Sequence, residues 1–92
     1  AYSISKSAII NFTRQMASYY GKYSINVNCV SPGGVLDNKM NKNFKKNYIN
    51  KVPIKRFANA NEISNLIIFL LSSGASYIHG ANIVIDGGWS IV

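Results

Sequence analysis

The chain of 92 residues contains one cysteine, one histidine and three acidic residues. Because Cys29 is alone, an internal disulfide is excluded, and we expect a reducing, cytoplasmic location. His79 has no second histidine and no nearby cysteine, so a metal site has no support, and we interpret His79 as a structural residue. The longest apolar run, residues 66–71, is far too short to span a bilayer, which argues against a membrane partner.

The shortage of acidic residues leaves ten lysines and arginines against three carboxylates, for a net charge of +7. Seven of the ten cations fall within residues 39–56. This basic segment is typical of a solvated surface, and it also suits an anionic partner such as a phosphorylated cofactor, an acidic substrate or a nucleic acid. No arginine cluster or recognised nucleic-acid-binding module accompanies it. We therefore expect no nucleic-acid partner and retain nucleic-acid binding as the weakest alternative.

Hydrophobic periodicity predicts a helix over residues 2–20, a strand over 25–30, a helix over 60–72 and a strand over 81–86. A helix, a strand and then a Gly-rich loop make half of a βαβ arrangement. The apolar run within 81–86 suits a strand that is covered on both faces, as in a parallel sheet. The predicted fold class is α/β.

The two long helices carry recognisable end signals. Gly21 is placed to end the first helix in a left-handed turn, and Asn59 with Glu62 forms a capping-box pattern at the start of the 60–72 helix. The first helix has an apolar stripe that predicts burial of one face, formed by Ala8, Phe12, Met16 and Tyr20 with Ile9, Thr13 and Ala17 beside it. The 60–72 helix is apolar nearly all round, so we expect it to be buried on more than one side.

Residues 36–51 are polar and basic, with Met40, Phe44 and Tyr48 at four-residue intervals. This pattern predicts one weak helix with a narrow apolar stripe. It suits a mobile lid over a ligand, and it suits a plain surface helix slightly better.

The segment 31–34 (Ser-Pro-Gly-Gly) is expected to stop the strand that precedes it, because proline cannot continue a central ladder. Its two glycines permit unusual dihedral angles or close approach of the backbone to a ligand. In open parallel sheets, ligands bind at the carboxyl ends of the strands. Residues 32–35 therefore lie on the expected functional edge, with an ordinary turn as the alternative.

Tyr2 and Lys6 stand four residues apart at the start of the first helix. Side chains at this spacing share one helix face, with roughly 5–6 Å between their Cβ atoms. A lysine cation held close favours the phenolate and lowers the pKa of the tyrosine toward the working range of a general acid/base. The same spacing also occurs on many helices without any catalytic role.

Together these segments resemble the C-terminal third of the short-chain dehydrogenase/reductase family, over essentially the whole chain. Four segments carry the likeness in the family's order: residues 2–8 with Y-x-[AS]-[ST]-K-[AG]-[AG], 25–33 with I-R-V-N-x-[VI]-x-P-G, 56–63 with R-x-G-x-P-x-E-[IV], and 77–88 with Y-[IV]-[TN]-G-x-x-[IL]-x-[VI]-D-G-G. Among the departures from the pattern, Ser7 stands where the family usually has alanine or glycine, Ala58 where it has glycine, and Ala60 where it has proline. The resemblance implies the C-terminal part of one doubly wound, Rossmann-like domain over residues 1–92.

The resemblance also implies roles. Tyr2 would be the general acid/base, and Lys6 would lower its pKa and hydrogen-bond the nicotinamide ribose. Pro32, Gly33 and the backbone of Val35 would border the nicotinamide of NAD or NADP. The hydride chemistry belongs to that cofactor.

Residues 36–51 would then be the substrate lid, with Leu36, Met40 and Phe44 as its apolar side chains. Asp37 stands where the family commonly has a threonine that contacts the cofactor amide or phosphate, so Asp37 is a weak candidate that would repel phosphate. The substrate is expected to be a small carbonyl or alcohol, such as an acyl thioester, a steroid, a polyol or a sugar. Residues 34–38 depart from the fatty-acid-type reductases and favour the sugar.

The family's catalytic serine and its G-x-x-x-G-x-G cofactor loop stand before the segment that Tyr2 begins. We therefore expect these 92 residues alone to be inactive and poorly soluble, with an unpaired sheet edge. Members of the family often form dimers or tetramers, so we expect a homo-oligomer at full length. A non-catalytic interaction fragment of the same family is the alternative to an enzyme piece.

Overall fold

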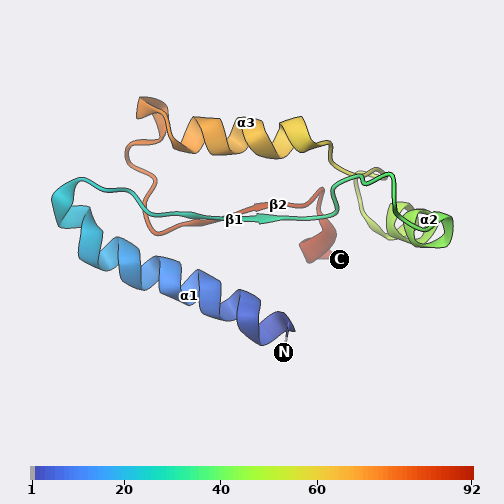
Figure 1. Cartoon of the computed structure of the whole chain (residues 1–92), viewed down its shortest axis with the longest axis horizontal. Coiled ribbons are helices and arrows are strands. Elements are labelled where there is room, and N and C mark those ends of the chain that lie inside the picture. Colours follow the sequence, from blue (N-terminus) through green and yellow to red (C-terminus); the bar gives the residue numbers. More distant parts are fainter. Residues whose placement is uncertain (1) are drawn as a thin grey trace. The chain divides into compact units, whose positions relative to one another are not determined.

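The computed structural model describes residues 2–92. Its elements in chain order are α1 (Tyr2–Tyr20), β1 (Cys29–Pro32), α2 (Lys42–Lys51), α3 (Ala60–Leu70) and β2 (Asn82–Ile85) (Figure 1). Short 3₁₀ turns follow α1 (Gly21–Tyr23), α3 (Ser73–Ala75) and β2 (Trp89–Ile91). The chain divides into two compact units, one made of residues up to 30 with 68–83 and the other of 31–67 with 84–92.

The strands β1 and β2 pair with each other in a two-stranded sheet (Figure 1). The Cys29 N–H donates to the Ala81 carbonyl at 2.8 Å, and the Gly33 N–H donates to the Ile85 carbonyl at 2.9 Å. Residue numbers rise together along both strands, so the pairing is parallel. The predicted α/β class, with two strands and about three helices, is confirmed for the described residues.

The first strand was predicted over 25–30, and the structure corrects this to Cys29–Pro32. Residues before Cys29 face residues 76–81, where the chain turns and Gly80 has a φ of 71°. One backbone hydrogen bond, from the Gly80 N–H to the Val27 carbonyl at 2.8 Å, joins the two segments, and their other hydrogen bonds involve side chains. The Asn28 side chain accepts the Ala81 N–H at 3.0 Å and donates to the Ile78 carbonyl at 2.9 Å. At the other end, the Cys29 N–H bonds Ala81, just before β2, and the Gly33 N–H bonds Ile85 in β2. In a parallel ladder every second N–H points to the partner strand, so the N–H that Pro32 lacks falls at an alternate position and costs no bond to β2.

The predicted ranges of β2 and α3 were also too long. β2 covers Asn82–Ile85 instead of 81–86, because the Asp86 carboxylate accepts the N–H groups of Gly88 and Ser90 and turns the chain. α3 ends at Leu70 instead of residue 72. The N–H groups of Leu71 and Ser72 donate to carbonyls three residues earlier, so the helix closes with a tighter turn. The Ser72 hydroxyl also donates to the Phe69 carbonyl, at 2.6 Å.

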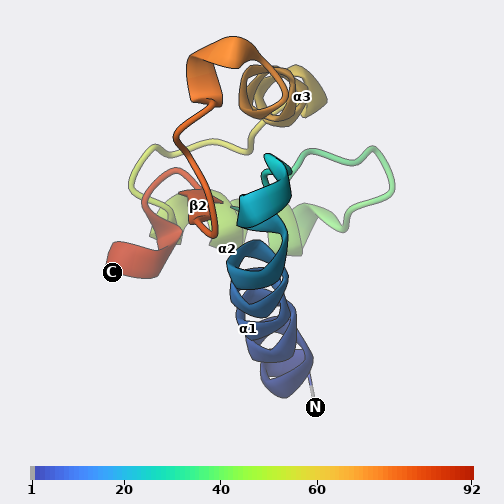
Figure 2. The same cartoon turned by 90° about the vertical axis from the view of Figure 1, so that its left-hand side faces the viewer.

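α1 ends at Tyr20 and leads into the turn Gly21–Tyr23 (Figure 2). The prediction that Gly21 adopts a left-handed conformation is wrong, because the left-handed residue is Ser24, at φ 60°. Glycine suits position 21 for another reason: a Cβ there would lie 3.0 Å from Nε2 of His79. His79 is structural, as we interpreted it. Its Nδ1 accepts the Val27 N–H at 3.2 Å, and Nε2 bonds the Ala17 carbonyl at 2.6 Å.

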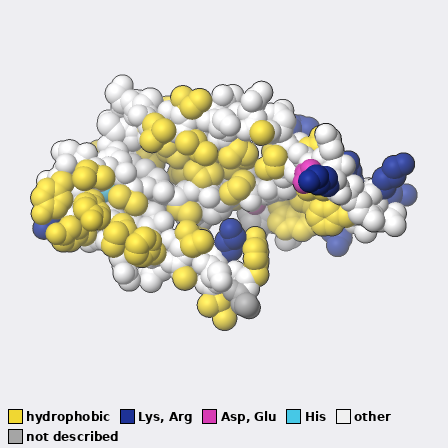
Figure 3. All heavy atoms as spheres, in the orientation of Figure 1, with side chains coloured by type: hydrophobic (Ala, Val, Ile, Leu, Met, Phe, Trp, Pro, Cys, Tyr) yellow, Lys and Arg dark blue, Asp and Glu magenta, His cyan; other side chains and the backbone are white. Residues whose placement is uncertain are grey.

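Burial is lower than the hydrophobic patterns predicted. In α1 only Thr13 and Ala17 are buried, whereas Ile9 and Phe12 are more than half exposed. Hydrophobic side chains also lie open around the C-terminal end of α1, where Tyr19 and Tyr23 are exposed (Figure 3). No residue of α3 is buried, so the expected burial on more than one side is not found within residues 2–92. No described helix combines the length and apolarity that a bilayer crossing needs.

The segment 36–51, predicted as one helix, is helical only in α2 (Lys42–Lys51). Asn41 caps α2, since its side chain accepts the Asn43 N–H at 2.7 Å. Before it, the Asp37 carboxylate accepts the Lys39 N–H at 3.0 Å, and the Asp37 carbonyl accepts the Met40 N–H at 3.1 Å. Asp and Asn side chains that bond nearby backbone groups compete with helix formation, which explains the late start.

α3 begins with the reciprocal capping pair that the sequence predicted. The Glu62 N–H donates to the Asn59 side chain, and the Glu62 carboxylate accepts the Asn59 N–H, both at 3.1 Å. The same carboxylate accepts two hydrogen bonds from Arg56, at 2.7 and 2.9 Å. These bonds, first that of the Arg56 side chain and then that of the Asn59 backbone, lower the pKa of Glu62 to about 2.

This arrangement gives a pH-dependent prediction for Glu62→Gln. The folded pKa of Glu62 lies below its unfolded value, so the stabilisation is present above the unfolded pKa and is lost as the pH falls from about 4.5 towards about 2. The variant should therefore have a lower free energy of unfolding than the parent at pH 7, with the difference shrinking through that window. Urea titrations followed by the fluorescence of Trp89, the single tryptophan, measure it. Asp37→Asn, which keeps an acceptor oxygen, is the control. A difference independent of pH would contradict the assignment.

Candidate active site

Tyr2 and Lys6 lie in the first two turns of α1. The Lys6 ammonium nitrogen is 5.5 Å from the centroid of the Tyr2 ring, so the two side chains share one face of the helix. Tyr2 is 77% exposed, which leaves its hydroxyl open to a reactant. This face of the helix therefore carries a phenol hydroxyl and an ammonium group close together.

The loop after β1 is fixed by Ala58. The Ala58 N–H donates to the Gly34 carbonyl at 2.9 Å, and the Leu36 N–H donates to the Ala58 carbonyl at 3.0 Å, which makes a parallel bridge between Val35 and Ala58. Because the N–H and C=O of a trans peptide group point in opposite directions, the N–H and C=O of Val35 face away from Ala58. Within residues 2–92 neither group has a hydrogen-bond partner. The loop therefore presents one free donor and one free acceptor side by side.

The two glycines of this loop are required by contacts within the chain. A Cβ on Gly33 would lie 2.8 Å from Cα of Asp86, and a Cβ on Gly34 would lie 2.7 Å from the Tyr48 ring. Neither glycine has a positive φ. The glycines thus permit close approach, as the sequence suggested, but the group that approaches Gly34 is a tyrosine side chain of the same chain.

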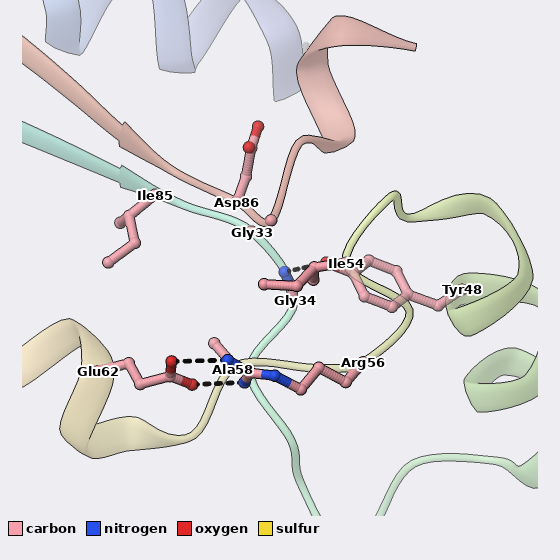
Figure 4. Close-up of a pocket in the computed structure, with 10 residues that line it drawn as sticks. Gly33, Gly34, Tyr48, Ile54, Arg56, Ala58, Glu62, Ile85 and Asp86 are labelled. Carbon is pink, nitrogen blue, oxygen red and sulfur yellow. Dashed lines mark hydrogen bonds and ion pairs between the residues drawn. The ribbon is translucent and has the colours of Figure 1, made fainter.

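Tyr48 is a site residue whose contacts the sequence did not reveal. Its hydroxyl accepts the Gly34 N–H at 2.8 Å (Figure 4). Its ring stacks on Phe57, with centroids 4.3 Å apart, and on Trp89, with centroids 5.0 Å apart. The only signal in the sequence was the stripe of Met40, Phe44 and Tyr48, which indicates packing but not a partner.

The remaining candidates of the predicted lid are mostly open to solvent. Leu36 and Phe44 are each 55% exposed, and Met40 is half-buried. Phe44 lines a shallow hollow of about 200 Å³ with Tyr48, Lys51 and Trp89. The Asp37 carboxylate is engaged by the Lys39 N–H.

A cavity of about 110 Å³ lies behind the loop, lined by Gly33, Gly34, Ile54 and Ile85, with Arg56 and Glu62 paired on one side (Figure 4). Ligand pockets usually measure about 300–1,000 Å³, so this cavity is too small for a cofactor ring and we assign no ligand to it. Among the residues the structure describes, no group of three or more His, Cys, Asp or Glu side chains is placed to hold a metal ion.

The close fit between Gly34 and Tyr48 predicts a non-additive pair of substitutions. Gly34→Ala should lower the free energy of unfolding by about 1–3 kcal/mol, the usual cost of overpacking. In a Tyr48→Ala background the ring is gone, so the same substitution should cost much less. Chemical unfolding of the parent, the two single variants and the double variant measures the coupling. Equal costs of Gly34→Ala in both backgrounds would show that the ring does not press on this position.

Comparison with known proteins places these features in a family. A family model described as enoyl-(acyl carrier protein) reductase matches residues 1–90. The 3-oxoacyl-[acyl-carrier-protein] reductase FabG of Buchnera aphidicola subsp. Schizaphis graminum is 43% identical over 91 residues, which cover 95% of this chain and 37% of that protein.

Two solved structures resemble the chain closely. A short chain dehydrogenase from Leptospira borgpetersenii with bound NAD⁺ has a TM-score of 0.90 at 42% identity, covering 97% of this chain and 35% of that one. A 4-hydroxyisoleucine dehydrogenase complexed with NADH has a TM-score of 0.92 at 34% identity, covering 99% of this chain and 40% of that one. The chain thus spans little more than a third of the length of these relatives, and its elements are part of a Rossmann-like domain. The chain belongs to the short-chain dehydrogenase/reductase family.

Proposed function

We propose that this chain supplies the C-terminal part of an NAD(P)-dependent oxidoreductase that interconverts a carbonyl and an alcohol. The observation that carries the proposal is the Tyr2–Lys6 pair, with the lysine nitrogen 5.5 Å from the tyrosine ring, in a chain that the family model matches over residues 1–90. In this proposal Tyr2 is the general acid/base and Lys6 stabilises its phenolate. The 92 residues alone are expected to be inactive.

The proposed chemistry divides between cofactor and protein. The bound nicotinamide supplies or accepts the hydride. When a carbonyl is reduced, the Tyr2 hydroxyl gives its proton to the substrate oxygen, and in the reverse direction the phenolate removes that proton. The Lys6 ammonium stabilises the negative oxygen that Tyr2 carries in between, and its N–H groups are suited to hold a ribose hydroxyl.

The loop after β1 fits the amide group of a nicotinamide. The Val35 N–H is a free donor and the Val35 C=O a free acceptor, which matches the carbonyl oxygen and NH₂ of a carboxamide. Pro32 is exposed at the end of β1 and offers an apolar surface. We propose that Pro32, Gly33 and Val35 border the nicotinamide of NAD or NADP. Asp37 is the weakest cofactor assignment, since its carboxylate is engaged locally and would repel phosphate.

We propose that the apolar side chains of Leu36, Met40 and Phe44 cover a small carbonyl or alcohol substrate. More than half of Leu36 and Phe44 is exposed, so these side chains have apolar surface that a substrate can bury. One relative is named as a 3-oxoacyl-[acyl-carrier-protein] reductase and another as a 4-hydroxyisoleucine dehydrogenase. Membership of the family therefore does not define the substrate. The sequence of residues 34–38 favours a sugar.

A chimera tests the proposal most directly. These 92 residues replace the matching C-terminal segment of the Buchnera reductase, and NADH- and NADPH-dependent reduction is measured with a panel of carbonyls that includes 3-oxoacyl, steroid and sugar substrates. We expect Tyr2→Phe to lower kcat by about 10²–10⁴-fold, the usual contribution of general acid/base catalysis. Lys6→Met should also lower kcat, because the negative oxygen of Tyr2 loses the cation that stabilises it.

The chain offers matched controls for both substitutions. Lys22 lies over the Tyr19 ring, 4.7 Å from its centroid, in the same kind of contact as Lys6 with Tyr2 but outside the proposed site. Tyr19→Phe and Lys22→Met should leave kcat and the pH profile unchanged. A chimera in which Tyr2→Phe retains full activity would overturn the proposal.

The exposed apolar surface favours a second role, association with another copy or with an intact relative. Large apolar side chains are open to solvent on α1 (Ile9 and Phe12) and around the end of α3 (Ile68, Phe69 and Leu71). Exposed apolar surfaces of this kind mark association sites or aggregation liabilities. We propose that the complete protein is a homo-oligomer, and that its location is cytoplasmic, as the single free cysteine suggests.

This second role has its own test. The purified 92-residue chain should aggregate or co-purify with an intact relative, here the Buchnera reductase carrying a different tag. Sedimentation velocity gives the state of the chain alone, and Phe12→Gln should weaken the association. A chain that stays monomeric at all concentrations and captures no relative would contradict it.

A further inference from the structure

We propose that Tyr48 is a positioning residue that couples α2 to the cofactor loop, setting the backbone of residues 34–35 for the nicotinamide. The inference rests on the proposed function, because it assigns a purpose to the free N–H and C=O of Val35. It goes beyond that function because it assigns the orientation of the cofactor loop to Tyr48, a residue of α2 that lies 14 residues along the chain from Gly34.

The hydroxyl of Tyr48 holds one peptide group of the loop. It accepts the Gly34 N–H at 2.8 Å, a distance typical of a well-formed hydrogen bond (Figure 4). The next peptide group is held by Ala58, which donates to the Gly34 carbonyl at 2.9 Å. Both polar groups of Gly34 are therefore fixed, one by a side chain of α2 and one by the backbone of the segment before α3.

The ring of Tyr48 cannot move easily, because aromatic residues lie on both of its faces. Phe57 stacks at 4.3 Å with an interplanar angle of 20°, and Trp89 stacks at 5.0 Å with an angle of 9°. Phe57 is itself buried, at 8% exposure. These residues come from two different segments, one between α2 and α3 and one after β2, so the position of the hydroxyl is set by contacts that do not involve the loop it holds.

The absence of a side chain at Gly34 completes the coupling. The ring carbon Cζ and the hydroxyl oxygen of Tyr48 would lie 2.7 and 2.9 Å from a Cβ at this position. The tyrosine thus lies directly on the loop backbone, one residue before Val35. A displacement of α2, such as opening of a lid, would pull the hydroxyl away from the Gly34 N–H and free the Gly33–Gly34 peptide group to rotate, which leaves the Gly34–Val35 group held by Ala58 alone.

Tyr48 acts through Gly34 and is not assigned contact with reacting atoms. Its effect should therefore fall on cofactor binding more than on the chemical step. Loss of one ordinary hydrogen bond typically weakens an interaction by about fivefold. In the chimera described above, Tyr48→Phe should raise the KM for the nicotinamide cofactor about fivefold while kcat at saturating cofactor changes by less than about twofold.

Amide hydrogen exchange in the chimera, measured without substrate, gives a readout that does not depend on activity. Tyr48→Phe keeps the stacked ring and removes only the acceptor, so the Gly34 amide should exchange about fivefold faster while the Leu36 amide, which bonds Ala58, is unchanged. Tyr77→Phe, at a fully exposed tyrosine, is the matched control and should change neither amide nor the KM.

The possible results separate the inference from the proposed function. An unchanged Gly34 amide, equal acceleration of Gly34 and Leu36, or an unchanged cofactor KM in Tyr48→Phe would each overturn the positioning role. A parent chimera that binds neither NAD⁺ nor NADP⁺ would overturn the proposed function and, with it, the cofactor role of Tyr48. Faster exchange at Gly34 in that case would show that the hydrogen bond exists without serving a cofactor.

Discussion

The two backbone hydrogen bonds that Ala58 makes around Val35 are the constraint on which the proposed cofactor site depends. Ala58 forms hydrogen bonds with the residues on both sides of Val35. Its carbonyl accepts the Leu36 N–H, and its N–H donates to the Gly34 carbonyl. Because peptide groups are planar and trans, these two bonds leave the polar groups of Val35 no direction except away from Ala58. The free donor and acceptor at the end of β1 are therefore a consequence of the fold and need no side chain to create them.

Two glycines and three aromatic residues pack around the loop that contains Val35. Gly33 lets the end of β1 lie against the Asp86 backbone, and Gly34 lets Tyr48 lie against the loop. The stacked Phe57, Tyr48 and Trp89 rings connect the segment before α3, the helix α2 and the turn after β2. In the other unit, His79 connects the end of α1 to the segment before β1 through Ala17 and Val27. Each unit is thus held by polar and aromatic contacts as much as by a hydrophobic core, which is small in both.

The sequence predicted what depends on neighbours along the chain. Residues four apart on one helix must share a face, so the approach of Lys6 to Tyr2 followed from their spacing. The capping pair of Asn59 and Glu62 follows from a spacing of three residues. The parallel α/β class followed from the order of elements and the apolar second strand.

What the sequence did not predict depends on distant partners. The start of β1 is set by residues 76–81, about 50 residues away along the chain. These residues form turns and not a strand, so Asn28 bonds to them through its side chain. The role of Tyr48 requires Gly34 and Trp89, which no local pattern connects to it. The sequence analysis overestimated the burial of α1 and α3. An apolar stripe indicates which side chains are suited to burial, but it does not show whether residues 2–92 contain the surface that buries them.

A crystal structure of the chimera with NAD⁺ bound tests the central claim most directly. The account predicts that the nicotinamide carboxamide accepts the Val35 N–H and donates to the Val35 carbonyl. A nicotinamide held elsewhere, with the polar groups of Val35 bonded to protein or left to water, would contradict it.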